Sequence, residues 1–220
     1  MVLQRALAAW IAVVAAAAPQ APRPPAEELA RRIQAHYDTV RDFTADFIHS
    51  YVGGVLRTRV TEQGRLQVKK PGRMRWDYTE PESKTFVSDG TELYSYLPAD
   101  RQVYVSPLPS EDQATTAVLF LAGKGNLLRD FTLSYAEDQA GAAPGTVALR
   151  LDPKLPDRDY DWLVLVVDRT SLRIRSLVAA DDQGGTSTFQ FRNLQENVGL
   201  ADRTFEFKIP RGVDVIRTGR

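Results

Sequence analysis

The stretch GRLQVKKPGRMRWDY, residues 64–78, decides the fold class, because its apolar and charged side chains alternate on either side of a central proline. The apolar members share one parity and are Leu66, Val68, Met74, Trp76 and Tyr78. The other parity is polar or charged and consists of Arg65, Gln67, Lys69, Arg73, Arg75 and Asp77. Successive side chains of a strand point to opposite faces, so this stretch predicts two strands with one apolar and one hydrated face.

The same two-residue period continues outward along the chain. The dipeptides Gly53-Gly54 and Asp89-Gly90 are typical of hairpin turns. The stretch WLVLVV, residues 162–167, is apolar at both parities, which predicts a strand covered on both faces. Strand-like runs occur at residues 43–47, 56–70, 73–78, 85–88, 92–97, 102–106, 131–135, 146–151, 161–168, 173–180, 186–194 and 205–209, and we expect them to form a sheet of about eleven strands. In residues 92–97, the pattern fits an inward position for Leu93 and for Tyr94 equally well.

Two segments have the helical period instead. Residues 27–40 predict an amphipathic helix with an apolar stripe of Leu29, Ile33, Tyr37 and Val40. Residues 110–121 predict a second helix with a stripe of Ala114, Ala117, Val118 and Leu121, and residues 126–129 predict one more helical turn. The fold class is therefore α+β and mainly β, with a single curved, antiparallel sheet covered by two or three helices. Incomplete filling between the helices and the sheet would leave an apolar cavity.

The first twenty residues differ from the rest of the chain. Arg5 is the only charged residue in residues 1–18, and the apolar run ALAAWIAVVAAAA, residues 6–18, follows it. This pattern predicts a secretory signal peptide over residues 1–20, followed by a single domain over residues 21–220. The alternative is an N-terminal membrane anchor, although the run is short for a membrane span.

Composition and motifs exclude several classes of function. The chain has 28 basic and 28 acidic side chains, so it lacks the basic excess of a nucleic-acid binder. It has no cysteine, which excludes disulfides, thiolate metal sites and a lipid anchor on its own cysteine. The two histidines, His36 and His49, fit structural roles, and no catalytic motif surrounds them, so we do not expect an enzyme.

A calcium loop is the one metal site that the sequence suggests. The acidic residues with suitable spacing are Asp157, Asp159, Asp161 and Asp168. Trp162 stands where such a loop needs glycine, and an apolar strand follows it. An acidic surface loop is the better interpretation, and we expect no bound metal.

Four phrases resemble the LolA family of outer-membrane lipoprotein carriers. They are GRLQVKKPGRMRWDY at residues 64–78, VSDGTELYSYLP at 87–98, FTADF at 43–47 and FEFKIPRGVDVI at 205–216. The resemblance implies a half-open barrel of about eleven strands under a helical lid, whose apolar space takes acyl chains. It also implies a periplasmic monomer without cofactor that receives acylated lipoproteins from an inner-membrane exporter complex. An outer-membrane acceptor lipoprotein, LolB-like, would take the cargo over.

The acceptor itself needs a lipidated cysteine, which this chain lacks. The remaining alternative is a related soluble half-barrel protein that binds glycolipids or senses envelope stress.

The resemblance also suggests the site residues. Lys70 takes the place of an arginine that ties the sheet to the lid, Met74 lies at the cavity mouth in place of an aromatic residue, and Trp76 matches a cavity tryptophan. The residues expected to line the cavity are Ile33, Phe47, Leu66, Val68, Met74, Trp76, Tyr78, Val118 and Leu121. Ordinary core positions for these side chains, and a solvated surface position for Lys70, are the alternatives.

Overall fold

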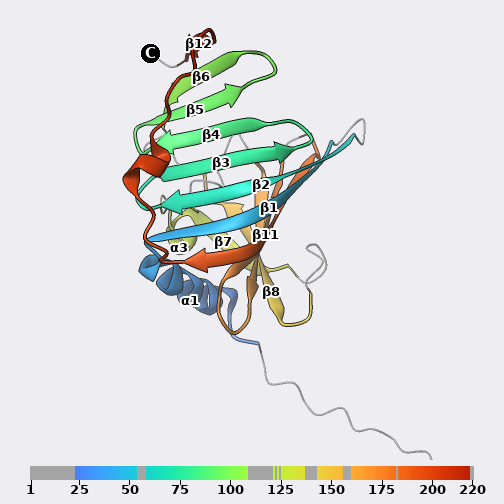
Figure 1. Cartoon of the computed structure of the whole chain (residues 1–220). Coiled ribbons are helices and arrows are strands. Elements are labelled where there is room, and N and C mark those ends of the chain that lie inside the picture. The colour runs from blue at the N-terminus through green and yellow to red at the C-terminus, as the bar shows by residue number, and fades with distance from the viewer. Residues whose placement is uncertain are drawn as a thin grey trace, which may run out of the picture.

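The described residues form one sheet of twelve strands, which curves strongly in the computed structural model (Figure 1). The structure describes residues 23–53, 58–108, 121, 123, 125–136, 143–155, 160–181 and 183–218. The strand order is β12-β6-β5-β4-β3-β2-β1-β11-β10-β9-β8-β7. The strands are β1 Asp42–Val52, β2 Arg59–Lys69, β3 Arg73–Glu80, β4 Lys84–Asp89, β5 Glu92–Leu97, β6 Gln102–Pro107, β7 Phe131–Tyr135, β8 Thr146–Pro153, β9 Trp162–Asp168, β10 Ile174–Ala180, β11 Thr186–Glu196 and β12 Asp214–Arg217. The predicted curved, mainly antiparallel sheet is thus confirmed.

Helix α1, Ala26–Thr39, packs its apolar stripe into the concave face of the sheet. The stripe predicted from the sequence is buried at every position, namely Leu29, Ile33, Tyr37 and Val40. The short helix α3, Leu127–Asp130, begins after Asn126, whose side chain accepts hydrogen bonds from the backbone N–H groups of Leu128 and Arg129. The helix predicted at residues 110–121 lies outside the described residues except for Leu121.

The alternation in β2 and β3 divides the two faces as the sequence predicted. Leu66, Val68, Met74 and Trp76 are buried on the concave side, which we call the inner face. Strand β9 is buried on both faces, as its continuous apolar run predicted. Its outward-facing residues Val164 and Val166 belong to a second, smaller apolar cluster.

The strand predicted at residues 205–209 is wrong. Phe205 ends a 3₁₀ helix, η1 Asp202–Phe205, and is buried beside β3 and β4, while the closing strand is β12. Strand β11 lies in the middle of the sheet and β12 at its edge, so the chain between them crosses the strands in between. Phe205 and Phe207 lie two residues apart because both pack on the sheet, and a segment lying on a sheet shows the same two-residue alternation as a strand within it.

Strand β12 pairs with β6 in parallel, unlike all other pairs of the sheet that the structure describes.

Candidate functional site

The inner face has two sides that differ in burial. One row of directly paired residues crosses it, and along this row Ala45, Leu66 and Trp76 are buried. The row continues through Phe86, Ser95 and Tyr104, which are each partly exposed. We call the inner face of β1–β3 and β7–β11 the packed side, and the inner face of β4–β6 the half-exposed side.

The pairing register also shows which side chains of β5 lie on the inner face. Leu93 pairs with Ser88, which pairs with Met74, so Leu93 shares the inner face with Met74. Tyr94 has the opposite parity, and its ring lies 5.4 Å from that of Phe207 in the crossing segment. The two alternatives that the sequence left open are therefore separated by strand pairing.

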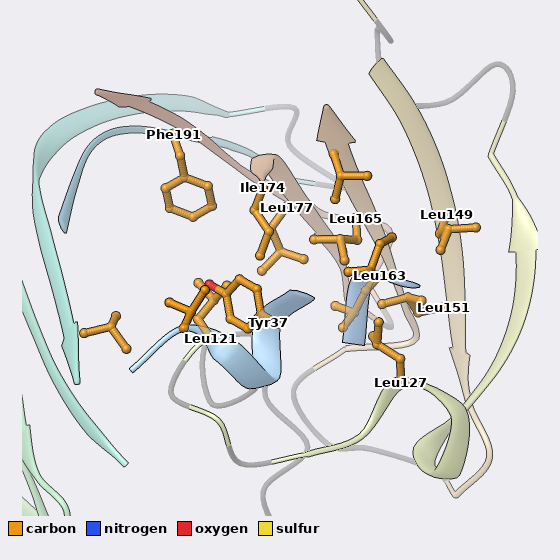
Figure 2. Close-up of a cluster of buried hydrophobic side chains, with 14 of the residues drawn as sticks. Tyr37, Leu121, Leu127, Leu149, Leu151, Leu163, Leu165, Ile174, Leu177 and Phe191 are labelled. Carbon is orange, nitrogen blue, oxygen red and sulfur yellow. The ribbon is translucent and has the colours of Figure 1, made fainter. Parts of the chain in front are cut away.

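The residues predicted to line the cavity come together in one apolar cluster under α1. Those that the structure describes are all buried in it, namely Ile33, Phe47, Leu66, Val68, Met74, Trp76, Tyr78 and Leu121. Val118 lies outside the described residues. Figure 2 shows Tyr37 and Leu121 in the same space as Phe191 of β11, Ile174 and Leu177 of β10, and Leu163 and Leu165 of β9. In this conformation these side chains pack against one another, and the larger apolar space expected from the sequence stays a prediction.

Aromatic rings of β1 and β11 gather around Trp76 of β3, the last strand of the packed side. The ring of Phe47 makes edge contacts with Trp76 at 5.0 Å and with Tyr78 at 4.8 Å between centroids. Phe189 lies 5.3 Å from Trp76 and stacks on His49 at 4.2 Å. Burial raises the pKa of Tyr78 well above its ordinary value, so its hydroxyl stays protonated at any physiological pH.

Gly64 allows this close packing of rings. A Cβ at position 64 would come within 2.8 Å of Cζ of Phe47, and it would also overlap the carbonyl oxygen of Asp77. Only a residue without a side chain therefore fits at this point of β2.

Lys70 lies between the sheet and α1. Its Nζ donates a hydrogen bond to the carbonyl oxygen of Tyr37 and sits 4.4 Å from the centre of the Tyr37 ring. With Gln34 and Asp38 it lines a pocket of about 140 Å³. Burial lowers the pKa of the Lys70 ammonium, and the acidic groups of Asp38 and Glu196 oppose that shift. The side chain is thus held against the helix rather than extended into solvent.

Gly123 makes room for the Lys70 stem. It has a positive φ of 76°, and a Cβ there would lie 2.7 Å from Cδ of Lys70. A larger residue would therefore force the lysine away from α1.

Sequence reasoning missed a polar cluster at the end of the inner face, because its members come from different strands. His49 Nδ1 lies 3.2 Å from Glu62 Oε2, and Lys84 Nζ donates to Glu62 Oε1 at 2.6 Å. Lys84 also lies over the ring of Tyr78, 4.4 Å from its centre. Burial lowers the pKa of His49, and Glu62 opposes this shift.

The anchoring of the crossing segment was also missed. The buried carboxylate of Asp42 accepts hydrogen bonds from the backbone N–H groups of Gly199 and Leu200. Lys69 donates to the carbonyl oxygen of Leu200 at 2.7 Å and to Asp202 at 2.5 Å. Two neighbouring lysines, 69 and 70, therefore hold two different elements against the sheet.

The acidic residues of the suggested calcium loop do not meet in the described part of the chain. Asp157 and Asp159 lie outside the described residues. Asp168 accepts backbone hydrogen bonds from Ser171 and Thr170, and these bonds together with Arg175 lower its pKa to about 2. Its carboxylate is thus used to close the turn between β9 and β10. Among the residues that the structure describes, no group of three or more potential metal ligands is found.

No helix within the described ranges is both long enough and apolar enough to cross a membrane. The fold and its interior define a class: half-barrel proteins with a one-sided curved sheet, an apolar core and a helix packed into the concave face. Within this class, the family model described as "Outer membrane lipoprotein carrier protein LolA" matches residues 38–208. The chain belongs to this family, which confirms the resemblance found in the sequence.

The sequence similarity to relatives extends over most of the chain. The outer-membrane lipoprotein carrier protein of Chromohalobacter salexigens is 31% identical over 191 residues, or 86% of this chain and 87% of the relative. The protein of the same name from Hahella chejuensis is 33% identical over 181 residues, or 81% of this chain and 83% of the relative. A crystal structure of an uncharacterized conserved protein from Thermus thermophilus has the same fold, with a TM-score of 0.55 and 14% identity over 88% of this chain and 99% of that one.

Proposed function

We propose that this protein carries acylated lipoproteins across the periplasm, from an inner-membrane exporter complex to an acceptor at the outer membrane. The family membership supports this proposal, and so does the apolar cluster on the inner face. Residues 1–20 would be removed as a signal peptide on export, and residues 21–220 would form the carrier domain. The protein works by binding and release and catalyses no reaction.

The proposed binding space for acyl chains lies between α1 and the inner face. Its walls would be the buried residues Ile33, Phe47, Leu66, Val68, Met74, Trp76, Tyr78 and Leu121, together with Val118. The half-exposed side would extend this floor through Phe86 and Leu93. Because the described side chains pack against one another, cargo enters by displacing α1 from the sheet.

Competition between helix and lipid makes both uptake and release possible. One acyl chain has roughly 15 methylene groups, and at about 0.8 kcal/mol each its transfer out of water is worth on the order of 12 kcal/mol. The apolar stripe of α1 buries its own surface at the same place, so it offsets part of this affinity. A carrier without such competition would bind its cargo too tightly to release it.

Lys70 would act as the latch of the closed form. Its single ammonium group holds one backbone carbonyl of α1, that of Tyr37. An arginine offers a planar fork of several donors, whereas a lysine offers a compact point charge. We therefore expect a latch that opens more readily than one built on arginine.

The first experiment tests the carrier function directly. Inner-membrane vesicles that contain a lipoprotein exporter and a triacylated lipoprotein are supplied with ATP and incubated with residues 21–220. We expect the lipoprotein to appear in the supernatant in complex with the protein. Lipoprotein that stays in the pellet, together with purified protein that yields no lipid on solvent extraction, would refute the proposal. Glycolipid in the extract without lipoprotein transfer would favour the alternative function.

The second experiment tests whether α1 must move. His36 of α1 and Glu196 of β11 are hydrogen-bonded at 3.0 Å, and the natural chain has no cysteine. A His36→Cys/Glu196→Cys variant can therefore be joined by a short bifunctional thiol reagent without side reactions. We expect the cross-linked protein to lose lipoprotein uptake, while the two single-cysteine variants treated with the same reagent retain it. Undiminished uptake by the cross-linked form contradicts the proposed opening.

A further inference from the structure

Trp76 carries a buried hydrogen-bond donor with no partner. Its side chain is 5% exposed, and its Nε1–H finds no acceptor among the residues that the structure describes. Buried polar groups are nearly always paired, because an unpaired donor loses its bonds to water and gains nothing in return. The buried hydroxyl of Ser88, by contrast, donates to the carbonyl oxygen of Gly72 at 2.7 Å.

The surrounding rings do not replace a true acceptor. Phe47 and Phe189 meet the indole in edge arrangements at 5.0 Å and 5.3 Å. A contact between an N–H group and an aromatic face is much weaker than a hydrogen bond to oxygen. The indole therefore sits among aromatic rings, and its Nε1–H is its single polar group.

The position of Trp76 on the sheet suggests what the donor serves. Across the sheet, it is the last buried residue of its row before the half-exposed side begins at Phe86. Along β3, the inner face is apolar at Met74 on one side of Trp76. On the other side come Tyr78 and the polar cluster of Glu62 and Lys84. Trp76 thus lies where an apolar surface changes into a polar one.

We infer that Trp76 Nε1–H binds a carbonyl oxygen of the linkage between an acyl chain and its glyceryl or amide head, and so selects acyl esters and amides over other lipids. This inference rests on the proposed carrier function. The acyl chain lies toward Met74 and Val68, and the polar head lies toward the cluster of Glu62 and Lys84. The carbonyl reaches the indole when the cargo displaces the side chains that cover it in the closed form.

A carbonyl fits this donor better than other acceptors do. A charged phosphate or carboxylate would leave water for an apolar site with a single donor, which costs more than one hydrogen bond returns. An ester or amide carbonyl is neutral and directly attached to the apolar chain, so both parts fit side by side. An ether oxygen in the same position is a poorer acceptor and provides a matched comparison.

The first test compares two lipids that differ only in this carbonyl. The probes are 1-monopalmitoylglycerol, an ester, and 1-O-hexadecylglycerol, the corresponding ether. We expect residues 21–220 to bind the ester about tenfold more tightly than the ether, since one otherwise unpaired buried donor is satisfied. Equal affinities for the two lipids would overturn the inference while leaving the carrier function intact. Failure of both lipids and of lipoprotein to bind would instead count against the carrier function.

The second test observes the donor itself. Trp76 and Trp162 are the tryptophans that remain after residue 20, so the Trp162→Phe variant has a single indole N–H signal in a ¹H–¹⁵N NMR spectrum. We expect this signal to shift downfield on addition of the ester and to move much less with the ether. An indole signal that responds equally to both lipids contradicts the assignment.

The third test removes the donor and keeps the ring. β-(3-Benzothienyl)alanine has the shape of tryptophan with sulfur in place of the N–H group, and it can be incorporated at position 76 of the Trp162→Phe variant. We expect the preference for the ester to disappear, with affinity for the ether unchanged within about twofold. Trp76→Phe provides a second variant that lacks the donor. A preference for the ester that survives both changes would overturn the inference.

Discussion

The packed side and the half-exposed side of the inner face are made from the same kind of sequence. Both consist of strands in which apolar and polar residues alternate, and one row of paired residues runs from Ala45 to Tyr104 through both. In the described structure α1 lies toward β11, β7 and α3, whereas β4–β6 occupy the opposite end of the sheet (Figure 1). Alternation therefore marks a face as apolar, while burial depends on what lies across from it.

The two sides also differ in how they could serve a carrier. On the packed side, lipid would compete with Leu66 and with Ile33 of α1, which are fully buried. On the half-exposed side, Phe86 and Leu93 are already partly exposed, so cargo would displace fewer packing contacts there. In the proposed function, the first side would govern stability, and the second would give cargo a place to begin binding.

The largest expected effect comes from comparing the same substitution at two leucines, one on each side. Leu66→Ala removes a fully buried side chain and should lower the free energy of unfolding by about 3 kcal/mol, because it leaves a cavity in the packed side. Leu93→Ala removes the same atoms from the half-exposed side and should cost under about 1 kcal/mol. Urea unfolding of both variants measures the difference. Similar losses for both leucines would show that the two sides are equally packed.

A single added methyl group should disturb the border between the sides. Gly64→Ala places a Cβ against the ring of Phe47 and the backbone of Asp77, so we expect a loss of about 2 kcal/mol from overpacking. Gly53→Ala is the control, because a Cβ there would have its nearest neighbour, Cε1 of Tyr51, at 3.5 Å. The melting temperatures of both variants test this. A stable Gly64→Ala protein would mean that the backbone at Asp77 and the ring of Phe47 can both move aside.

Loosening the latch should affect only the helix on the packed side. Lys70→Met keeps the apolar stem and removes the bond to the Tyr37 carbonyl, so amide hydrogens of α1 should exchange about fivefold faster. The neighbouring variant Lys69→Met should leave α1 protected and speed exchange around Leu200 and Asp202 instead. Hydrogen exchange with mass spectrometry resolves the two segments. Unchanged exchange in α1 of the Lys70→Met protein would remove the latch from the proposed function.

The smallest effect concerns His49 and pH. Burial lowers the pKa of folded His49 below its ordinary value of 6.5, so the unfolded chain takes up this proton first as the pH falls. The contribution to stability is complete above pH 6.5 and is lost as the pH falls from there through the lower folded pKa. We expect melting temperatures measured from about pH 7.5 to about pH 5 to fall less steeply for His49→Gln than for the natural protein. An equal or steeper fall in the variant would show that His49 does not contribute.

Much of the fold could be predicted because it depends on local pattern. The alternation in residues 64–78, the stripe of α1 and the continuous apolar run of β9 each gave the right element and the right buried face. The error at residues 205–209 has a clear cause, since a segment that crosses a sheet shows the same alternation as a strand within it. Family resemblance led to Lys70 as a candidate for the latch, and the contact with Tyr37 was found only in the structure.

The amino-acid sequence by itself determined which residues are apolar, at what period they recur, and therefore which elements form and which face of each avoids water. The tertiary structure alone decided which strands became neighbours, and hence that His49, Glu62 and Lys84 meet and that Leu93 rather than Tyr94 points inward. It also decided that the donor of Trp76 has no partner among the described residues. The physical reason is that the spacing at which apolar residues recur depends only on residues close together in the chain. Pairing and hydrogen-bond satisfaction depend on residues that are far apart in the chain and meet only when the sheet closes.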